Sequence, residues 1–265
     1  MINEWKKTNH LDKLEWIDLL NLSKLEIYYE LVIWLPWLAL SLISAAYEFY
    51  IVALGFSFVF FITGLRLNHN ACHYAVGISK KSHEYVLFIL SILMLGSMHA
   101  VQVNHLRHHK YFPESKDIEA ISAHKPALEA FLIGPFFPII LHTKALQVGS
   151  LIQKKWICLE LSMNVFWVYI VFNVLNLNFL KYHIMVMLLA QCMTAFFAVW
   201  TVHHDCDSEK HIARTIRNKF KAKLTFNMFY HLEHHLFPAV PTCHLHLLAK
   251  RMDEAAPLLQ KKQVF

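Results

Sequence analysis

The chain carries four apolar stretches, each long enough for a helix to cross a lipid bilayer, which takes ~20 residues. They cover residues 27–47, 49–67, 156–177 and 182–202. Glu48 alone separates the first two, and the short link 178–181 separates the last two. Hydrophobic residues make up 56% of the chain although 17% of it is charged, so the charges must lie outside these stretches. We therefore predict an all-α integral membrane protein with four transmembrane helices in two hairpins.

The basic residues are distributed unevenly about these helices. If only the four stretches cross the membrane, Lys181 alone among the 25 Lys and Arg residues lies on the side opposite both termini. The positive-inside rule makes the side of the termini cytoplasmic. Two further apolar segments, 85–103 and 126–142, are ambiguous. We expect the first to lie in or dip into the interface, with a fifth span as the alternative, because spanning would separate the histidine motifs described below.

No linker rich in Gly, Ser and Pro divides the 265 residues, so we expect one domain with three parts. These are an N-terminal interfacial segment (1–26), a transmembrane and interfacial core (27–202) and a cytosolic C-terminal helical cap (203–265). The first segment lacks the basic start and apolar core of a signal peptide, and is interpreted as an amphipathic helix. The net charge of +6 is spread along membrane-proximal segments, which favours membrane lipids as partners and not nucleic acid.

Histidines gather in three short motifs, each placed directly after an apolar stretch. A pair at i and i+4 is followed by two His-x-x-His-His runs, which gives His69 and His73, then His105, His108 and His109, then His231, His234 and His235. Side chains at i, i+3 and i+4 share one face of a helix, so each motif can aim its imidazoles at one point. Neutral imidazole binds Fe, Zn and Cu. Eight ligands exceed the four of a tetrahedral zinc site, which predicts a dimetal site.

Ligating histidines need hydrogen-bond acceptors at their second ring nitrogen, which fix the tautomer. We predict this role for Asp205, Asp207 and Asn227, which lie near the motifs in the sequence. Glu233 lies inside the last motif but on a different helical face from its histidines, so we expect a surface or supporting position for it. His99 lies in an apolar segment where an unpaired imidazole is costly, so we expect structural partners for it.

In order and spacing these motifs resemble the three histidine boxes of the membrane fatty acid desaturase superfamily, which also includes hydroxylases and carotenoid ketolases. The resemblance covers roughly residues 31–241, including Asn-Met-Phe-Tyr before the third box and Leu-Phe-Pro after it. It implies a transmembrane stem and a cytosolic cap that binds two iron ions. In that family a further ligand usually comes from the end of the fourth transmembrane helix, where this chain has His203 and His204. We expect one of the two to ligate and favour His204, which lies farther into the cytosolic layer.

The resemblance implies an enzyme that uses O2 as a co-substrate and electrons from an external donor. The sequence has no heme, iron–sulfur or dinucleotide motif, so we expect a separate ferredoxin, cytochrome or reductase. The expected reaction introduces a C=C bond into a long fatty acyl chain. A hydroxylase or ketolase of a lipid, an alkane or a carotenoid is the alternative within the family. A non-enzymatic membrane metal-binding protein or transporter is less favoured, because its ligands would lie within the transmembrane helices.

Overall fold

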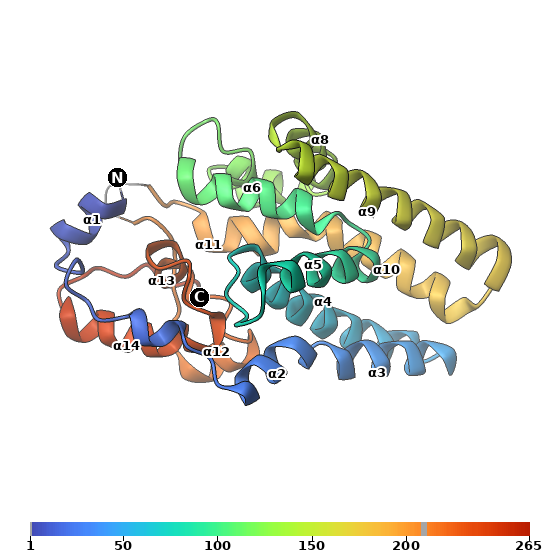
Figure 1. Ribbon diagram of the computed structural model, residues 1–265, viewed down its shortest axis with the longest axis horizontal. Coiled ribbons are helices and arrows are strands. Elements are labelled where there is room, and N and C mark those ends of the chain that lie inside the picture. The colour runs from blue at the N-terminus through green and yellow to red at the C-terminus, as the bar shows by residue number, and fades with distance from the viewer. Residues whose placement is uncertain (1, 208–210) are drawn as a thin grey trace.

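The structure, a computed structural model, describes residues 2–207 and 211–265. Within these ranges the chain is predominantly helical, and β pairing is limited to an isolated bridge between Thr215 and Gln263. Figure 1 shows an elongated molecule whose long helices converge from one end toward a bulkier end that carries both termini. We call the long helices of residues 24–72 and 151–203 the stem. The short elements of residues 2–20 and 211–265 form the cap.

The first half of the stem comprises α2 (Lys24–Val32), α3 (Leu35–Ala46) and α4 (Tyr50–Cys72). Ser23 starts α2 with a capping box, in which its hydroxyl accepts from the Glu26 backbone and the Glu26 carboxylate accepts from the Ser23 backbone. The chain reverses at Glu48, whose φ of 63° lies in the left-handed region. α3 then packs along α4, and the hydroxyls of Ser41 and Ser57 are 2.7 Å apart between them.

The second half of the stem comprises α9 (Leu151–Ile170), η3 (Val171–Leu175), α10 (Asn178–Thr194), η4 (Ala195–Trp200) and α11 (Thr201–His203). α9 packs against α5 and α6, and α10 packs against α3 and α4. By length and composition, four helical segments of the described chain can cross a membrane: Lys24–Ala46, Tyr50–Cys72, Leu151–Leu175 and Asn178–His203. The four predicted transmembrane segments are therefore confirmed.

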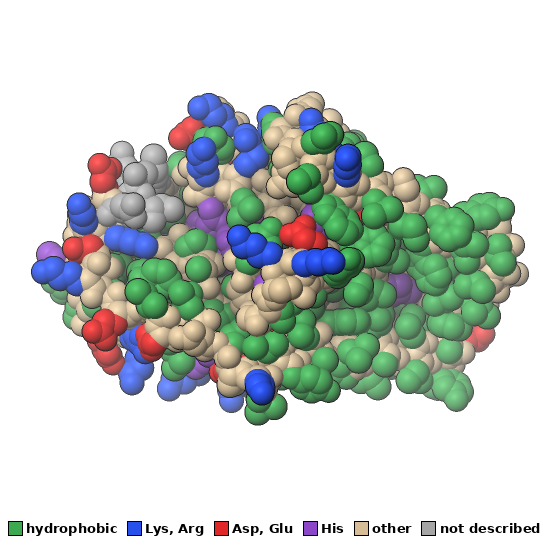
Figure 2. Space-filling model, viewed as in Figure 1, with side chains coloured by type: hydrophobic (Ala, Val, Ile, Leu, Met, Phe, Trp, Pro, Cys, Tyr) green, Lys and Arg blue, Asp and Glu red, His purple; other side chains and the backbone are tan. Residues whose placement is uncertain are grey.

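Charged and apolar side chains occupy different parts of the surface. Figure 2 shows hydrophobic side chains covering the far end of the stem, and basic and acidic side chains gathered around the cap. Stem residues such as Ile51 and Val165 are 89% and 72% exposed, respectively, although they are fully apolar. A continuous exposed apolar surface of this kind is what a lipid bilayer covers. The protein is thus an integral membrane protein.

The segment predicted to dip into the interface lies in two helices, α5 (Lys80–Met94) and α6 (Met98–Tyr111), and the chain bends by 114° between them. A buried carboxylate on α9 holds this bend, since Glu160 accepts hydrogen bonds of 2.5 Å from the Ser97 hydroxyl and 3.3 Å from the His99 backbone. The His99 ring lies 2.5 Å from Glu160 and 2.8 Å from Glu84 through its two nitrogens. It also stacks on Trp156. His99 therefore has structural partners, and the bend aims α6 toward the cap.

The ambiguous segment 126–142 forms parts of two short helices, α7 (Ala127–Leu132) and α8 (Phe137–Val148), which follow η2 (Glu119–Ser122). The remaining cap elements are α12 (Lys219–Leu224), α13 (His231–Leu236), η5 (Thr242–His244) and α14 (Leu245–Ala255). Among them α14 packs against α13, the helix that carries the third histidine motif.

The N-terminal segment was predicted to form one amphipathic helix, and this prediction is wrong. It forms α1 (Ile2–Thr8) and η1 (Ile17–Leu20) with an irregular connection between them. Trp5, Leu11 and Leu19 are buried in one hydrophobic cluster with Leu236 and Leu248 of the cap. These three side chains are covered by protein, whereas Ile17 and Leu25 remain exposed. The segment therefore packs on the cap and does not present one continuous amphipathic face.

Candidate metal centre

Four helices bring the histidine motifs to one place between the stem and the cap. α4 contributes His69 and His73 at its C-terminal end, α6 contributes the second motif, and α13 contributes the third. α11 adds His203 at the end of the fourth span. Nine imidazoles from distant parts of the chain therefore meet, grouped as two adjacent clusters.

The first cluster is formed by His69, His73, His105 and His234, whose candidate ligand nitrogens all lie within 4.8 Å of one another. His109 lies at its edge, with its Nε2 2.8 Å from Nε2 of His234 and 3.2 Å from Nε2 of His105. Both ring nitrogens of His69 and Nε2 of His73 are buried and lack a hydrogen-bond partner among the described residues. Such orphaned polar atoms are costly unless they bind a ligand.

The second cluster is formed by His108, His203, His231 and His235, which are all buried and whose candidate ligand nitrogens also lie within 4.8 Å of one another. Nε2 of His203 is 2.9 Å from Nε2 of both His108 and His231. Nε2 of His235 is 3.2 Å from the same two atoms. Four Nε2 atoms thus converge on one point in a buried space.

These spacings fit a bound metal ion. With a metal–imidazole bond of about 2.1 Å, two ligands at right angles are about 3.0 Å apart, close to the 2.8–3.2 Å observed between Nε2 atoms. Burial, and then repulsion from neighbouring histidines, lowers the pKa of His231, His234 and His235 well below its usual value. A neutral imidazole has a free lone pair on one ring nitrogen. Because protonation of these buried rings is disfavoured, a bound metal cation is what satisfies the converging lone pairs. The residues present therefore fit two metal ions.

Two carboxylates orient histidines of the second motif. Nδ1 of His108 lies 2.6 Å from Oδ2 of Asp117, and Nδ1 of His105 lies 2.9 Å from Oε1 of Glu119. Oδ1 of Asp117 also accepts from the backbone N–H groups of Glu119 and Ala120 at the start of η2. The carboxylate is thereby fixed, and it holds the His108 proton on Nδ1 so that the Nε2 lone pair faces the cluster.

Asp117 and Glu119 were not among the acceptors predicted from the sequence, although an Asp-x-Glu pair shortly after the second motif is a usable signal. The predicted acceptors are placed differently. Asp205 and Asp207 are exposed to solvent, and Asn227 is partly buried in the turn before α13, where its φ is 62°. Because an exposed carboxylate does not fix a buried ring, we correct the prediction for Asp205 and Asp207. Among the described residues no hydrogen bond joins the Asn227 side chain to a cluster histidine, so the orienting role falls to Asp117 and Glu119.

The two histidines at the end of the fourth span are also separated by the fold. α11 ends at His203, and His204 leaves the helix with φ −61° and ψ 138°. The His204 ring stacks on Trp200 with centroids 4.0 Å apart, and its Nε2 lies 2.9 Å from Nη1 of Arg214. The structure places His203, and not the favoured His204, in the second cluster, so that preference is corrected.

Glu233 is fully buried beneath the third motif. Its Oε1 accepts from Nη2 of Arg217 at 2.6 Å, and its Oε2 accepts from the Thr215 hydroxyl at 2.6 Å. Arg217 also bonds Asp253 on α14. Glu233 thus anchors α13 to the rest of the cap on the side away from the histidines, which is a supporting position and not a surface one.

A buried ion pair supports the first motif. Arg66 on α4 bonds both carboxylate oxygens of Glu30 on α2 and donates to the backbone oxygen of Phe226, and both charged side chains are buried. Asn70, one turn later, donates to Glu30 at 3.0 Å and accepts from the Thr242 backbone at 3.0 Å. This network joins α2, α4 and the cap directly beside His69 and so fixes the depth of the first motif.

We expect Asp117→Asn to lower metal affinity by about 10–100-fold, the usual effect of losing a partner that orients a ligand. Asparagine can retain the Oδ1 acceptor for η2 but places an amide where Oδ2 met His108. Metal titration of the purified variant measures the change. Glu114→Gln, on an exposed carboxylate three residues earlier, is the control. Equal affinity in both variants would show that Asp117 does not orient His108.

Comparison with known protein families identifies one family that matches this chain. The sequence model of the fatty acid desaturase family matches residues 44–263. The matched range runs from the end of α3 to the C-terminal tail, so it includes every histidine of both clusters. No curated protein sequence and no solved structure matches the chain significantly.

Proposed function

Because the chain belongs to the fatty acid desaturase family, we propose that it is an oxygen-dependent di-iron lipid oxidoreductase that introduces a C=C bond into a long fatty acyl chain. The observation that carries this proposal is the pair of all-histidine clusters at the end of an apolar helical stem. Imidazole is a suitable ligand for iron, and the adjacent clusters would hold two ions side by side. The oxidoreductase class follows from the family, and the substrate and outcome are our proposal.

In this proposal the first iron would be held by His69, His73, His105, His109 and His234, and the second by His108, His203, His231 and His235. When bound, two iron ions would supply the activation of O2 and the oxidation of an unactivated C–H bond. Asp117 and Glu119 hold protons on Nδ1 of His108 and His105, which keeps both Nε2 lone pairs directed inward. Burial of the rings excludes water that would otherwise consume an oxidising centre.

The substrate class is argued from position. α4 and the fourth span run through the stem and end at the clusters, so a hydrocarbon chain in the membrane can reach the centre along the same direction. Its polar head would stay near the charged cap. We further propose that a separate ferredoxin, cytochrome or reductase supplies the electrons, because the chain has no motif for a redox cofactor of its own.

Product analysis tests the reaction. Membranes that contain the protein, a reductase system and O2 are analysed by mass spectrometry, with the His73→Ala variant as the inactive control. We expect an acyl product lighter than its substrate by two hydrogen atoms. A product heavier by one oxygen atom would replace desaturation with hydroxylation, and a carbonyl in place of a methylene would indicate a ketolase. Lipids identical to those of the control would contradict an oxidoreductase that acts on lipids.

We also propose that both termini and the metal centre lie on the cytoplasmic side. Reporter fusions at Ser79 and Lys116 should then report the cytoplasm, and fusions at Glu48 and Lys181 the opposite side, because the basic residues concentrate with the termini. Fusions at the two termini serve as internal references. An opposite-side signal at Lys116 would mean that the α5–α6 pair crosses the membrane.

A further inference from the structure

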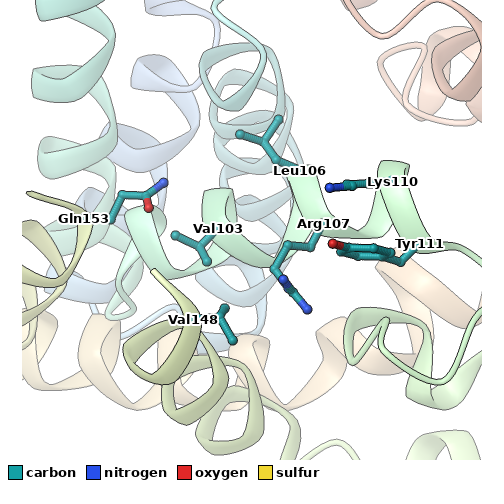
Figure 3. Close-up of a pocket in the computed structure, with 7 residues that line it drawn as sticks. All are labelled: Val103, Leu106, Arg107, Lys110, Tyr111, Val148 and Gln153. Atoms are coloured by element: carbon teal, nitrogen blue, oxygen red, sulfur yellow. The ribbon is translucent and has the colours of Figure 1, made fainter. Parts of the chain in front are cut away.

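A small cavity lies on the outer face of α6, where α8 ends and α9 begins, and Figure 3 shows the side chains around it. Its volume is about 240 Å³. Val103 and Leu106 of α6 and Val148 of α8 form an apolar wall. Leu106 and Val148 are 40% and 39% exposed, so the wall is open to the surroundings.

The other side of the cavity is positively charged. The Arg107 guanidinium lies 4.9 Å from the centroid of the Tyr111 ring, and Nζ of Lys110 lies 5.0 Å from it. Lys116 approaches the same ring at 5.8 Å. Among the ion pairs formed by described residues, none involves Arg107 or Lys110. Lys116 pairs with Glu114 at 3.7 Å, so the cations without a carboxylate partner among the described residues are Arg107 and Lys110. Two such cations side by side create a positive potential that an anion can relieve.

The cavity lies beside the start of a segment that can span the membrane. α9 begins the span Leu151–Leu175 beside it, and Leu151 and Ile152 in its first turn are each 70% exposed. Figure 2 shows basic side chains over this part of the molecule, next to the hydrophobic surface of the stem. An apolar wall and a cationic wall that meet at this boundary match the two halves of a phospholipid.

We propose that this cavity binds the headgroup of an anionic phospholipid, with its phosphate between Arg107 and Lys110 and its acyl chains along Val148 and the exposed face of α9. Basic pockets at the edge of transmembrane helices hold such headgroups. An acidic protein partner would leave the apolar wall unused, whereas a lipid occupies both walls.

The proposed lipid is distinct from the substrate. Residues 103, 107 and 110 lie about half a helical turn from His105, His108 and His109 on α6. A headgroup held by Arg107 is therefore separated from the clusters by the body of α6. Its effect would be to hold α6 against α8 and α9, independently of any turnover.

The test uses the full-length protein purified in detergent and native mass spectrometry with added phosphatidylglycerol, phosphatidylcholine or inorganic phosphate. We expect a complex with phosphatidylglycerol that phosphatidylcholine does not displace. Arg107→Gln combined with Lys110→Gln should weaken it roughly 30-fold, since each membrane-proximal cation contributes about fivefold. Lys219→Gln combined with Lys223→Gln removes two exposed cations of α12 and should leave the affinity unchanged.

Equal binding of phosphatidylglycerol and phosphatidylcholine to the unmodified protein would overturn the proposal, and this comparison holds even if the double variant does not fold. Unchanged affinity in the Arg107 and Lys110 variant would also overturn it. Binding of inorganic phosphate as tight as that of the lipid would reduce the cavity to an anion site. If the Arg107 and Lys110 variant lost binding to an acidic redox protein but still bound phosphatidylglycerol normally, the face would be assigned to an electron donor and the lipid proposal would be overturned.

Discussion

His203→Ala is expected to lose metal from the second cluster and to abolish turnover, whereas His204→Ala keeps both. His203 places its Nε2 2.9 Å from Nε2 of two other cluster histidines, and it is 1% exposed. His204 stacks on Trp200 outside the clusters. Removal of a ligand should cost more than the 10–100-fold loss in metal affinity typical of a residue that only orients one.

Metal content and single-turnover product yield, measured on both variants in parallel, check this expectation. His204→Ala is a matched control, because it removes an adjacent histidine from the same helix end. If His204→Ala loses metal and His203→Ala retains it, the assignment is reversed. If neither variant loses metal, the eight histidines of the three motifs suffice and both residues are structural.

Glu30→Ala is expected to destabilise the protein by about 3–5 kcal/mol, the usual cost of leaving one member of a buried ion pair without its partner. Arg66 would remain buried, with Asn70 deprived of the carboxylate to which it donates. Because α4 carries His69 three residues after Arg66, the loosened helix should also bind metal more weakly. Replacing Glu30 and Arg66 together by Leu and Met should cost less than the single change.

Chemical unfolding in detergent, with and without added metal, measures these losses. Asp18→Ala is the control, since Asp18 forms an exposed ion pair with Arg251 and its loss should change stability little. A Glu30→Ala variant as stable as Asp18→Ala would show that the buried network does not hold α4 in place. A double variant less stable than Glu30→Ala would show that the two residues act separately.

The features predictable from the sequence are those with local signals. The four spans are apolar over enough residues to cross a bilayer, and this property does not depend on how the helices pack. The histidine motifs have helical spacing, so the residues of each motif share a face before any tertiary contact forms. A dimetal site was predicted from their number, but the assignment of each histidine to one cluster was not, because the division of His105, His108 and His109 between the clusters depends on the rotation of α6.

The features that escaped prediction depend on single backbone turns. His203 and His204 differ because α11 ends between them, and no residue pattern in the sequence marks that point. The bend between α5 and α6 begins at Leu95. Its φ of 52° lies in the left-handed region, although the residue is not a glycine. Asp117 reaches His108 only because the chain folds back after α6. Proximity in the sequence pointed instead to Asp205 and Asp207, which the fold exposes to solvent.

We propose that the two histidine clusters together hold two iron ions, and the metal content of reconstituted protein tests this most directly. Protein stripped of metal is loaded anaerobically with iron-57, and the bound iron is counted and examined by Mössbauer spectroscopy. We predict about two irons per chain, each in a histidine-rich environment, and about one per chain in His203→Ala. A saturating content of one iron or none in the unmodified protein would contradict the claim.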